Sequence, residues 1–352
     1  MRRYVPDAGS RVTSRLLATA IVALGIALAL PAASAAAKDK PFYEGKTVRL
    51  VISAGAAGGY MQYARLLVEH LGKHLAGHPS FIVQSMPGAG GVVATNYLFK
   101  QAPQDGTTFG LIHAAMPLAP LFGTTGARFD AQKFHWIGSL DRSNGLCTAW
   151  HTAPIKTWND MLTKEFVVGS SGAGIDIYPK MLNELFGTKI KIVGGYKSGA
   201  EIFLAMERGE VEGRCSPQYT SMLSLHPTWF AEKKVLVPVV IAEKRSPNFP
   251  DSPSIMEFVK DDNAREQIRL LIVSQDMDRP FLLPPGVPEA RVREMRAAFL
   301  ATTKDPAFIA DAEKQRLHLD PVAGDDLTKA LAHAYALPQS VVDSAKNLMV
   351  EK

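Results

Sequence analysis

The sequence predicts an α/β protein of two lobes, each a mainly parallel β-sheet flanked by helices, with a ligand cleft between them. Strand-like runs alternate with helical patterns, and this alternation starts again after Asp141. Such alternation is typical of parallel sheets that carry helices on both faces. The chain has 352 residues, which is more than a single hydrophobic core usually serves, so two domains are expected.

Residues 1–35 are predicted to be a secretory signal peptide. Four arginines lie before and at the edge of the apolar run 16–30, and the small residues Ala33-Ser34-Ala35 follow Pro31. This order is that of an export signal, with cleavage expected after Ala35. A retained signal anchor is the alternative, although the apolar run is short for a membrane span.

The basic charge of the chain comes mainly from this leader. Lys and Arg total 39 against 34 for Asp and Glu. The leader holds four of the arginines and one of the acids, so the remaining chain is nearly neutral. Because no later segment carries a run of basic residues, nucleic-acid binding has no support.

The first half of the mature chain alternates strands and helices. The pattern predicts a strand at 46–53, a helix at 60–74, a strand at Ser80–Ser85, a helix from the turn 87–91 to Lys100, and a strand at 107–113. In the first helix Met61, Ala64, Val68 and Leu71 recur at spacings of three and four, so they share one face.

The second half repeats this alternation. It predicts a strand at 166–171, a helix capped by Asp176 and closed by Gly187, a strand at 189–195, a helix at 198–208, strands at 211–215 and 235–242, and a helix at Glu289–Thr302. Segments beyond that helix are expected to complete the first lobe. Lobe 1 would then comprise 41–140 and 274–352, and lobe 2 would comprise 141–273. The chain would cross between them near 140–144 and 271–279.

Enzyme signatures are incomplete. The motif at 88–93 lacks the third glycine and the later acid of a dinucleotide site, and the serines at 170 and 171 only loosely resemble a nucleophile elbow. His70, His74 and His78 lack the further ligands that a metal site needs, and a solvated helix edge is favoured. No catalytic residue, metal or cofactor is expected.

Glycine-rich loops follow four predicted strands, at 53–59, 88–91, 170–174 and 194–199. Glycine allows close approach of the backbone, and the helix N-termini that follow offer unpaired N–H groups and partial positive charge. Such loops bind anions without a basic side chain. A single loop of this kind is usually just a tight turn, and 88–91 is the strongest candidate for that; four such loops, two in each predicted lobe, are harder to explain as turns alone. Lys197 and Arg214 can add charge-assisted bonds or lie solvated on the surface.

The mature chain has two cysteines, Cys147 and Cys215. In an oxidising compartment they can form a disulfide. Two separately buried thiols are the alternative, because spacing alone does not bring their Cα atoms together.

Ordered motifs along the mature chain resemble a known family, the solute-binding proteins of tripartite tricarboxylate transporters, also called the Bug family. The motifs are FYEGKTVRL at 42–50, GGY at 58–60, YARLL at 63–67, MPGAGG at 86–91, DGT at 105–107, GSSGAG at 169–174, GYK at 195–197 and GEVEG at 209–213.

The resemblance implies a periplasmic binding protein of the type II-like fold that delivers a small organic acid to two integral membrane subunits. A monomer and a mono- or dicarboxylate cargo are expected, with aromatic acids among the candidates. The alternatives are the ligand-binding component of a signalling system and a secreted serine hydrolase. The residues expected near the ligand are Ala56, Ala57, Gly58, Gly59, Tyr60, His113, Ala114, Ser170, Ser171, Ala173, Gly174, Tyr196 and Cys215.

The first loop departs from the family pattern. Ala56-Ala57 precede Gly58-Gly59, and Met61 stands where an aspartate is expected. A less polar wall follows, which predicts a carboxylate with an apolar or aromatic body.

Overall fold

The computed structural model describes Met1 and residues 40–56, 59–170, 177–196, 199–216 and 220–349. Pro41–Lys352 form one compact unit. The predicted signal peptide lies outside the described residues, apart from Met1. Among the helices that are described, none has the length and apolarity needed to cross a bilayer.

The first sheet has the strand order β11-β4-β10-β3-β1-β2. β1 pairs in parallel with β2 and β3, whereas β10 is antiparallel to β3 and β4, and β11 is antiparallel to β4. The strands are β1 Thr47–Ile52, β2 Ser80–Ser85, β3 Thr108–Leu111, β4 His135–Ser139, β10 Pro280–Leu283 and β11 Val322–Ala323. We call the part of the chain built on this sheet the six-stranded lobe.

The second sheet has the order β7-β6-β8-β5-β9. β6 is parallel to β7 and β8, and β5 runs antiparallel to β8 and β9. The strands are β5 Gly145–Trp150, β6 Phe166–Gly169, β7 Ile190–Val193, β8 Gly213–Ser216 and β9 Val235–Ile241. This is the five-stranded lobe. Both sheets are therefore mixed, and most strands in each run in one direction, which confirms the predicted fold class.

The two sheets share one topology. Five neighbouring strands of the first, β2-β1-β3-β10-β4, correspond in order and direction to β7-β6-β8-β5-β9 of the second. In both, the antiparallel strand is the one that follows a connection from the other sheet. Residues 140–144 join β4 to β5, and the second connection reaches β10 through α8 (Asp262–Ile272) and η6 (Val273–Met277).

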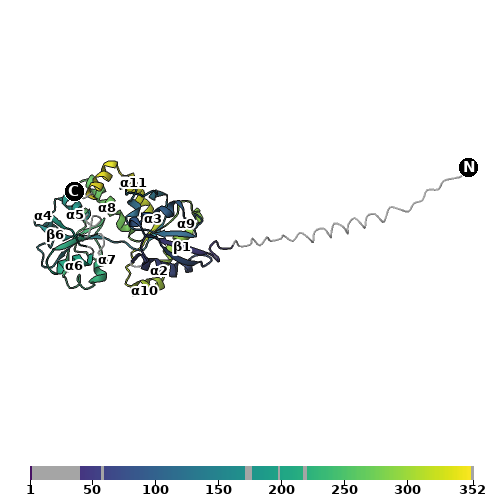
Figure 1. The fold of residues 1–352 in the computed structure, drawn as a ribbon, viewed down its shortest axis with the longest axis horizontal. Helices are drawn as coiled ribbons and strands as arrows, with labels where there is room; N and C mark the ends of the chain where they lie inside the picture. The colour runs from purple at the N-terminus through teal and green to yellow at the C-terminus, as the bar shows by residue number, and fades with distance from the viewer. Residues whose placement is uncertain (2–39, 57–58, 171–176, 197–198, 217–219, 350–352) are drawn as a thin grey trace. The chain divides into compact units, whose positions relative to one another are not determined.

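Helices flank each sheet, as Figure 1 shows. Those of the six-stranded lobe are α2 Gly59–Leu71, η1 Gly72–His74, α3 Val92–Lys100, α9 Glu289–Thr302, α10 Pro306–Lys314 and α11 Gly324–Ala336. Those of the five-stranded lobe are α4 Trp158–Thr163, α5 Ile177–Phe186, α6 Gly199–Glu207 and α7 Thr220–Leu225. Shorter 3-10 helices are η2 Ala89–Gly91, η3 Met116–Leu118, η4 Ala131–Lys133 and η5 Ile255–Phe258.

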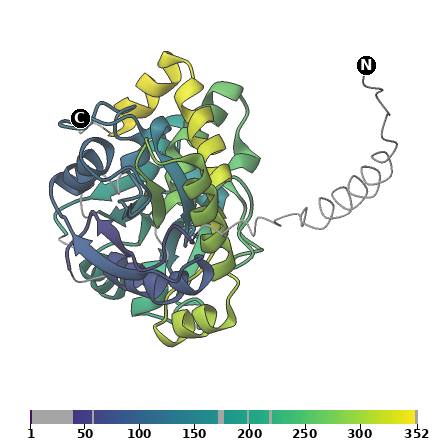
Figure 2. The same cartoon turned by 90° about the vertical axis from the view of Figure 1, so that its right-hand side faces the viewer.

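The last helix, α12 (Gln339–Met349), packs against α8 and α5. Figure 2 shows the yellow C-terminal helices beside the green segment that contains α8. The C-terminal segment thus contacts a helix of the five-stranded lobe as well as the lobe it was expected to complete. The lobe boundaries drawn from the sequence remain predictions.

The helix α2 buries the apolar stripe that the sequence predicted, including Met61, Ala64 and Leu71. His70 of α2 and His74 of the following η1 hold this segment to α10 and to its N-cap residue. His70 is only 4% exposed, and its Nε2 lies 3.0 Å from Asp311 Oδ2, while His74 Nε2 lies 3.2 Å from Asp305 Oδ2. The interpretation of His70 as a solvated residue is therefore wrong: it is buried between two helices.

A disulfide joins Cys147 on β5 to Cys215 on β8. The two residues are register partners in the antiparallel pair, so their Cα atoms lie 3.9 Å apart. Sheet pairing thus supplies the proximity that sequence spacing could not.

Candidate functional site

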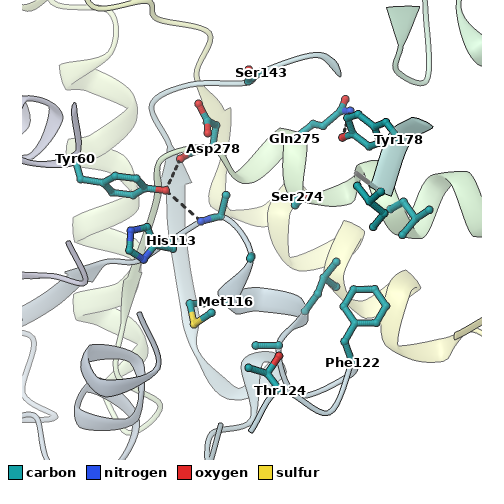
Figure 3. A pocket seen from close by; sticks show the side chains of 16 residues that line it. Tyr60, His113, Met116, Phe122, Thr124, Ser143, Tyr178, Ser274, Gln275 and Asp278 are labelled. Carbon is teal, nitrogen blue, oxygen red and sulfur yellow. Dashed lines mark hydrogen bonds between the residues drawn. The ribbon is translucent and has the colours of Figure 1, made fainter. Parts of the chain in front are cut away.

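A cavity of about 380 Å³ lies between residues of the two lobes. Figure 3 shows its walls. The described lining residues are Tyr60, His113, Ala114, Ala115, Met116, Leu118, Ala119, Phe122, Thr124, Ser143, Ile177, Tyr178, Leu271, Ser274, Gln275 and Asp278. They come from the start of α2, the segment after β3, both connections between the sheets, and the start of α5.

Tyr60 forms one corner of the cavity. Its hydroxyl donates to the backbone oxygen of Asp278 at 3.3 Å and accepts from the backbone nitrogen of Ala114 at 3.2 Å. Burial, as the largest cause, raises the pKa of Tyr60 to about 12. The phenol is therefore neutral at pH 7 and fixes the segment after β3 against the second connection.

His113 lies beside Tyr60, with ring centroids 4.7 Å apart. Its Nδ1 lies 3.0 Å from the backbone oxygen of Gly90. Because a carbonyl only accepts, Nδ1 carries the proton in that bond and Nε2 is left as an acceptor in the neutral ring. Burial is the largest cause that lowers the pKa of His113, so the neutral form dominates at pH 7.

The glycine turn at 88–91 supports this histidine. Gly91 has φ of +107°, and a Cβ at that position would lie 2.8 Å from His113 Nδ1. A side chain there would strain the backbone and displace the imidazole. The loop therefore positions His113 through Gly90 and Gly91, which agrees with the sequence-based view of 88–91 as a structural turn.

Tyr178 and Gln275 face the cavity from the five-stranded lobe and the second connection. Gln275 Nε2 donates to the Tyr178 hydroxyl at 2.7 Å and to the backbone oxygen of Ile241 at 2.8 Å. The Tyr178 hydroxyl accepts in this bond and keeps its own proton, for which the described residues provide no acceptor. Burial raises its pKa to about 12. Tyr178 is thus a neutral donor available to a ligand.

Asp278 is the one acid among the described lining residues, and its charge is balanced. Asp278 is 2% exposed, and its Oδ1 lies 2.8 Å from Arg279 Nη1. The Arg279 guanidinium lies 4.6 Å from the Tyr60 ring centroid and 4.8 Å from that of Tyr63. The pair therefore adds no net charge to this wall.

Most of the remaining lining is apolar, including Met116, Leu118, Phe122, Ile177 and Leu271. Among the described lining residues there is no lysine or arginine. A bound group would therefore meet neutral donors and apolar side chains.

Three of the predicted site residues, Tyr60, His113 and Ala114, line the cavity together. Two other predicted residues precede Tyr60 in the chain. Ala56 is exposed. Gly59 is the first residue of α2 and lies close to the Arg279 side chain, since a Cβ built on Gly59 would be 3.6 Å from Arg279 Nη2. Ala57 and Gly58 lie outside the described residues.

The predicted site residues of the five-stranded lobe lie elsewhere. Ser170 is 2% exposed, and its backbone nitrogen donates to Val193 at 2.8 Å. Tyr196 is half-buried beside Gly169. Cys215 is 1% exposed and bonded to Cys147. These three do not line the cavity. Ser171, Ala173 and Gly174 fall outside the described residues.

Met61 does not line the cavity either. It is 7% exposed in the core of the six-stranded lobe. The apolar character that the sequence analysis attributed to Met61 comes instead from residues such as Met116 and Phe122.

Sequence reasoning missed the cavity residues on the connections and on α5, namely Ser143, Tyr178, Ser274, Gln275 and Asp278. A signal for most of them was present, because 140–144 and 271–279 were predicted to join the lobes. A connection between two lobes necessarily lies beside the cleft between them.

Two lobes of one topology, with a neutral cavity between them, define a ligand-binding protein of the two-lobed class. The chain belongs to the tripartite tricarboxylate transporter receptor family, TctC, whose model matches residues 63–333. This confirms the resemblance seen in the sequence motifs.

Known proteins agree with this assignment. A UPF0065 protein encoded in the gbd 5′ region of Cupriavidus necator is 30% identical over 73% of this chain and 74% of its own length. A TctC solute-binding protein from Polaromonas has a TM-score of 0.66 at 18% identity, covering 86% of this chain and 99% of that one. Rpa4515 of R. palustris, solved with adipate, has a TM-score of 0.58 at 18% identity over 86% and 97% of the two chains.

Proposed function

We propose that this protein captures a small organic acid in the periplasm, a mono- or dicarboxylate, and delivers it to the two integral membrane subunits of a tripartite transporter. The observation that carries the proposal is the placement of two helix N-termini at one cavity. Tyr60 is the second residue of α2, and Ile177 and Tyr178 are the first two of α5. One helix belongs to each lobe.

Helix N-termini favour anions because their first N–H groups lack intrahelical partners and carry partial positive charge. The Tyr178 hydroxyl adds a neutral donor at the same place. Hydrogen bonds from such donors to an ionised carboxylate are stronger than those to a neutral acceptor. A carboxylate can therefore be held here without a basic side chain, and the apolar walls suit a hydrocarbon or aromatic body.

Binding, rather than turnover, fits the described residues. The serine nearest the predicted elbow, Ser170, is buried and does not line the cavity. Ser53 lies 3.2 Å from His113 Nδ1 but is only 1% exposed, so it offers a substrate no accessible nucleophile. Membership of a receptor family and the adipate in the R. palustris relative support an acid as cargo.

The proposal is tested by thermal unfolding of the mature protein, residues 36–352, against a panel of mono- and dicarboxylates. A ligand at 100 times its dissociation constant should add about 2.7 kcal/mol to the free energy of unfolding. Tyr178→Phe should weaken the best acid about tenfold or more, because it removes one hydrogen bond to a charged group. Tyr43→Phe is the control, since Tyr43 is likewise a fully buried tyrosine whose hydroxyl makes one hydrogen bond, to the backbone oxygen of Gly106, but it lies outside the cavity.

No shift with any acid, or hydrolysis of an ester panel by the pure protein, would contradict the proposal. Delivery needs a second assay, in which uptake of the labelled acid by vesicles containing the two membrane subunits should require this protein.

A further inference from the structure

Gln275 connects the cargo cavity to the end of a β-strand. It is 6% exposed and belongs to η6, in the second connection between the sheets. Its Nε2 lies 2.7 Å from the Tyr178 hydroxyl and 2.8 Å from the backbone oxygen of Ile241, the last residue of β9. Its own backbone oxygen accepts from the backbone nitrogen of Ser143 at 3.1 Å. The side chain is therefore fixed to one sheet, and the backbone is fixed to the first connection.

The Ile241 carbonyl decides which end of the Gln275 amide faces Tyr178. A backbone carbonyl only accepts hydrogen bonds, so the atom between it and the tyrosine must be the amide nitrogen and not the amide oxygen. An amide nitrogen only donates, so the Tyr178 hydroxyl has to accept from it. The phenolic proton then points away from Gln275. Gln275 thus makes Tyr178 a donor toward the cavity.

Close packing holds this arrangement in place. Gly145 begins β5 and is the register partner of Ile241. A Cβ built on Gly145 would lie 2.5 Å from Tyr178 Cε2 and 3.1 Å from Gln275 Nε2. Figure 3 shows the two side chains together, on the right and away from Tyr60. The pair therefore rests directly on the sheet backbone, and its geometry is kept by packing as well as by hydrogen bonds.

We propose that Gln275 is a positioning residue that sets the polarity of the cargo site, so that the site selects an acid over the corresponding amide. This inference rests on the proposed function. An ionised carboxylate carries lone pairs and no proton, so it matches a tyrosine that has to donate. A primary amide of the same size offers only its carbonyl oxygen to that donor and gives up the charge-assisted bond. Gln275 makes this distinction through Tyr178.

Gln275→Glu inverts the polarity. The new carboxyl group has nearly the same shape and places an oxygen where Nε2 lies. When ionised, it only accepts; when protonated, its one proton goes to the Ile241 carbonyl, and its lone pairs remain for the tyrosine. In either state the Tyr178 hydroxyl donates to position 275. Its lone pairs, rather than its proton, then face the cargo.

The test measures the affinities of the mature protein by calorimetric titration. The ligands are each acid that stabilises wild type in the thermal panel and its primary amide, for example hexanoate and hexanamide. Wild type should prefer the acid about tenfold, the difference between a charged and a neutral hydrogen bond. Gln275→Glu should weaken the acid by more than Tyr178→Phe does, because lone pairs now face the carboxylate. It should leave the amide within about threefold, so the preference is lost.

The double variant shows whether Gln275 acts through Tyr178. Added to Tyr178→Phe, Gln275→Glu should weaken the acid by less than about a further threefold, because the hydroxyl that it reorients is gone. An equal loss in the two backgrounds would show that the new carboxyl repels the acid directly, and the proposal would be wrong. Gln267→Glu is the matched control. Gln267 is also 6% exposed, but it lies on α8 outside the cavity, so both affinities should stay unchanged.

Gln275→Met provides a second measurement if the buried carboxyl prevents folding. A thioether is a weak acceptor and not a donor, so it no longer directs the Tyr178 proton into the cavity. The affinity for the acid should fall about threefold or more in the protein that retains Tyr178, and should not change in the Tyr178→Phe background.

The remaining outcomes separate this inference from the proposed function. If acids bind wild type no more tightly than their amides, or if Gln275→Glu weakens acid and amide equally, Gln275 does not set the polarity and the function stands. If no acid of the panel binds wild type, both proposals fail.

Discussion

Asp141 is a buried carboxylate in the first connection between the sheets. It is 1% exposed, its Oδ1 lies 2.7 Å from His318 Nδ1, and its Oδ2 lies 3.3 Å from the Tyr63 hydroxyl. Tyr63 also donates to the backbone oxygen of His318 at 2.7 Å. These contacts join the connection to α2 and to the segment after α10.

The pair should make stability depend on pH. The hydrogen bond to Asp141, as the largest cause, raises the pKa of His318 above its usual 6.5. A raised pKa in the folded state stabilises the protein fully below about pH 6.5, and that contribution is lost as pH rises through the folded pKa. His318→Gln should therefore lower the free energy of unfolding more at pH 5.5 than at pH 9. Denaturant titration of both proteins measures the difference, and an equal loss at the two pH values would contradict it.

Individual site residues could be predicted where they directly follow a strand. Tyr60 and His113 were predicted from the family resemblance, and they lie just beyond the predicted strand 46–53 and at the end of the predicted strand 107–113. Tyr178 and Gln275 were not, since their role depends on a hydrogen bond between residues 97 positions apart. Arg214 was noticed, but the sequence could not separate a solvated arginine from a buried one.

At the scale of elements, the contact between β5 and β8 allows no added volume. A Cβ on Gly213 would collide with the backbone oxygen of Thr148 on β5, and it would lie 2.6 Å from Phe166 Cζ. Neither the sheet backbone nor the buried ring can move away cheaply.

Gly213→Ala should therefore lower the free energy of unfolding by about 2 kcal/mol, within the range for overpacked cores. Gly194→Ala is the matched control, because nothing lies within 4 Å of its added Cβ, and it should change stability by less than about 0.5 kcal/mol. Chemical denaturation of the three proteins compares them. Equal stabilities would show that the pairing of β5 with β8 is looser than the structure indicates.

The helices and strands that could be predicted from the sequence were those with a clear hydrophobic periodicity or a clear residue signal at their ends. Ser80–Ser85 and Glu289–Thr302 agree with the prediction at both ends. The antiparallel strands were missed. β5 is buried along its whole length and shows no alternation, and β10 begins at Pro280, which argues against a central strand in a sequence. Both segments become strands because they pair with strands that are distant in the sequence.

At the scale of the whole molecule, α12 connects the C-terminus to both α8 and α5. Leu348, near its end, is 2% exposed. The helix therefore packs on the second connection and on the helix whose start lines the cavity.

Leu348→Ala should lower the free energy of global unfolding by about 2–3 kcal/mol, because it removes buried apolar volume. Asn347→Ala, on the exposed face of the same helix, should have little effect. Unfolding followed by both fluorescence and circular dichroism is the measurement. If the Leu348 variant only frays locally and keeps the wild-type midpoint, α12 lies outside the cooperative unit.

The shared strand order also sets when each sheet can be completed during synthesis. Every strand of the five-stranded sheet lies between Gly145 and Ile241, so that sheet has all its strands once residue 241 has left the ribosome. The six-stranded sheet lacks β10 until residue 283. Until then β3 and β4, which β10 separates, have no hydrogen-bonding partner on those facing edges. The lobe that begins the chain is thus the later one to close. A nascent chain stalled before residue 280 carries unpaired edges on both β3 and β4, and misassembly would start on these edges.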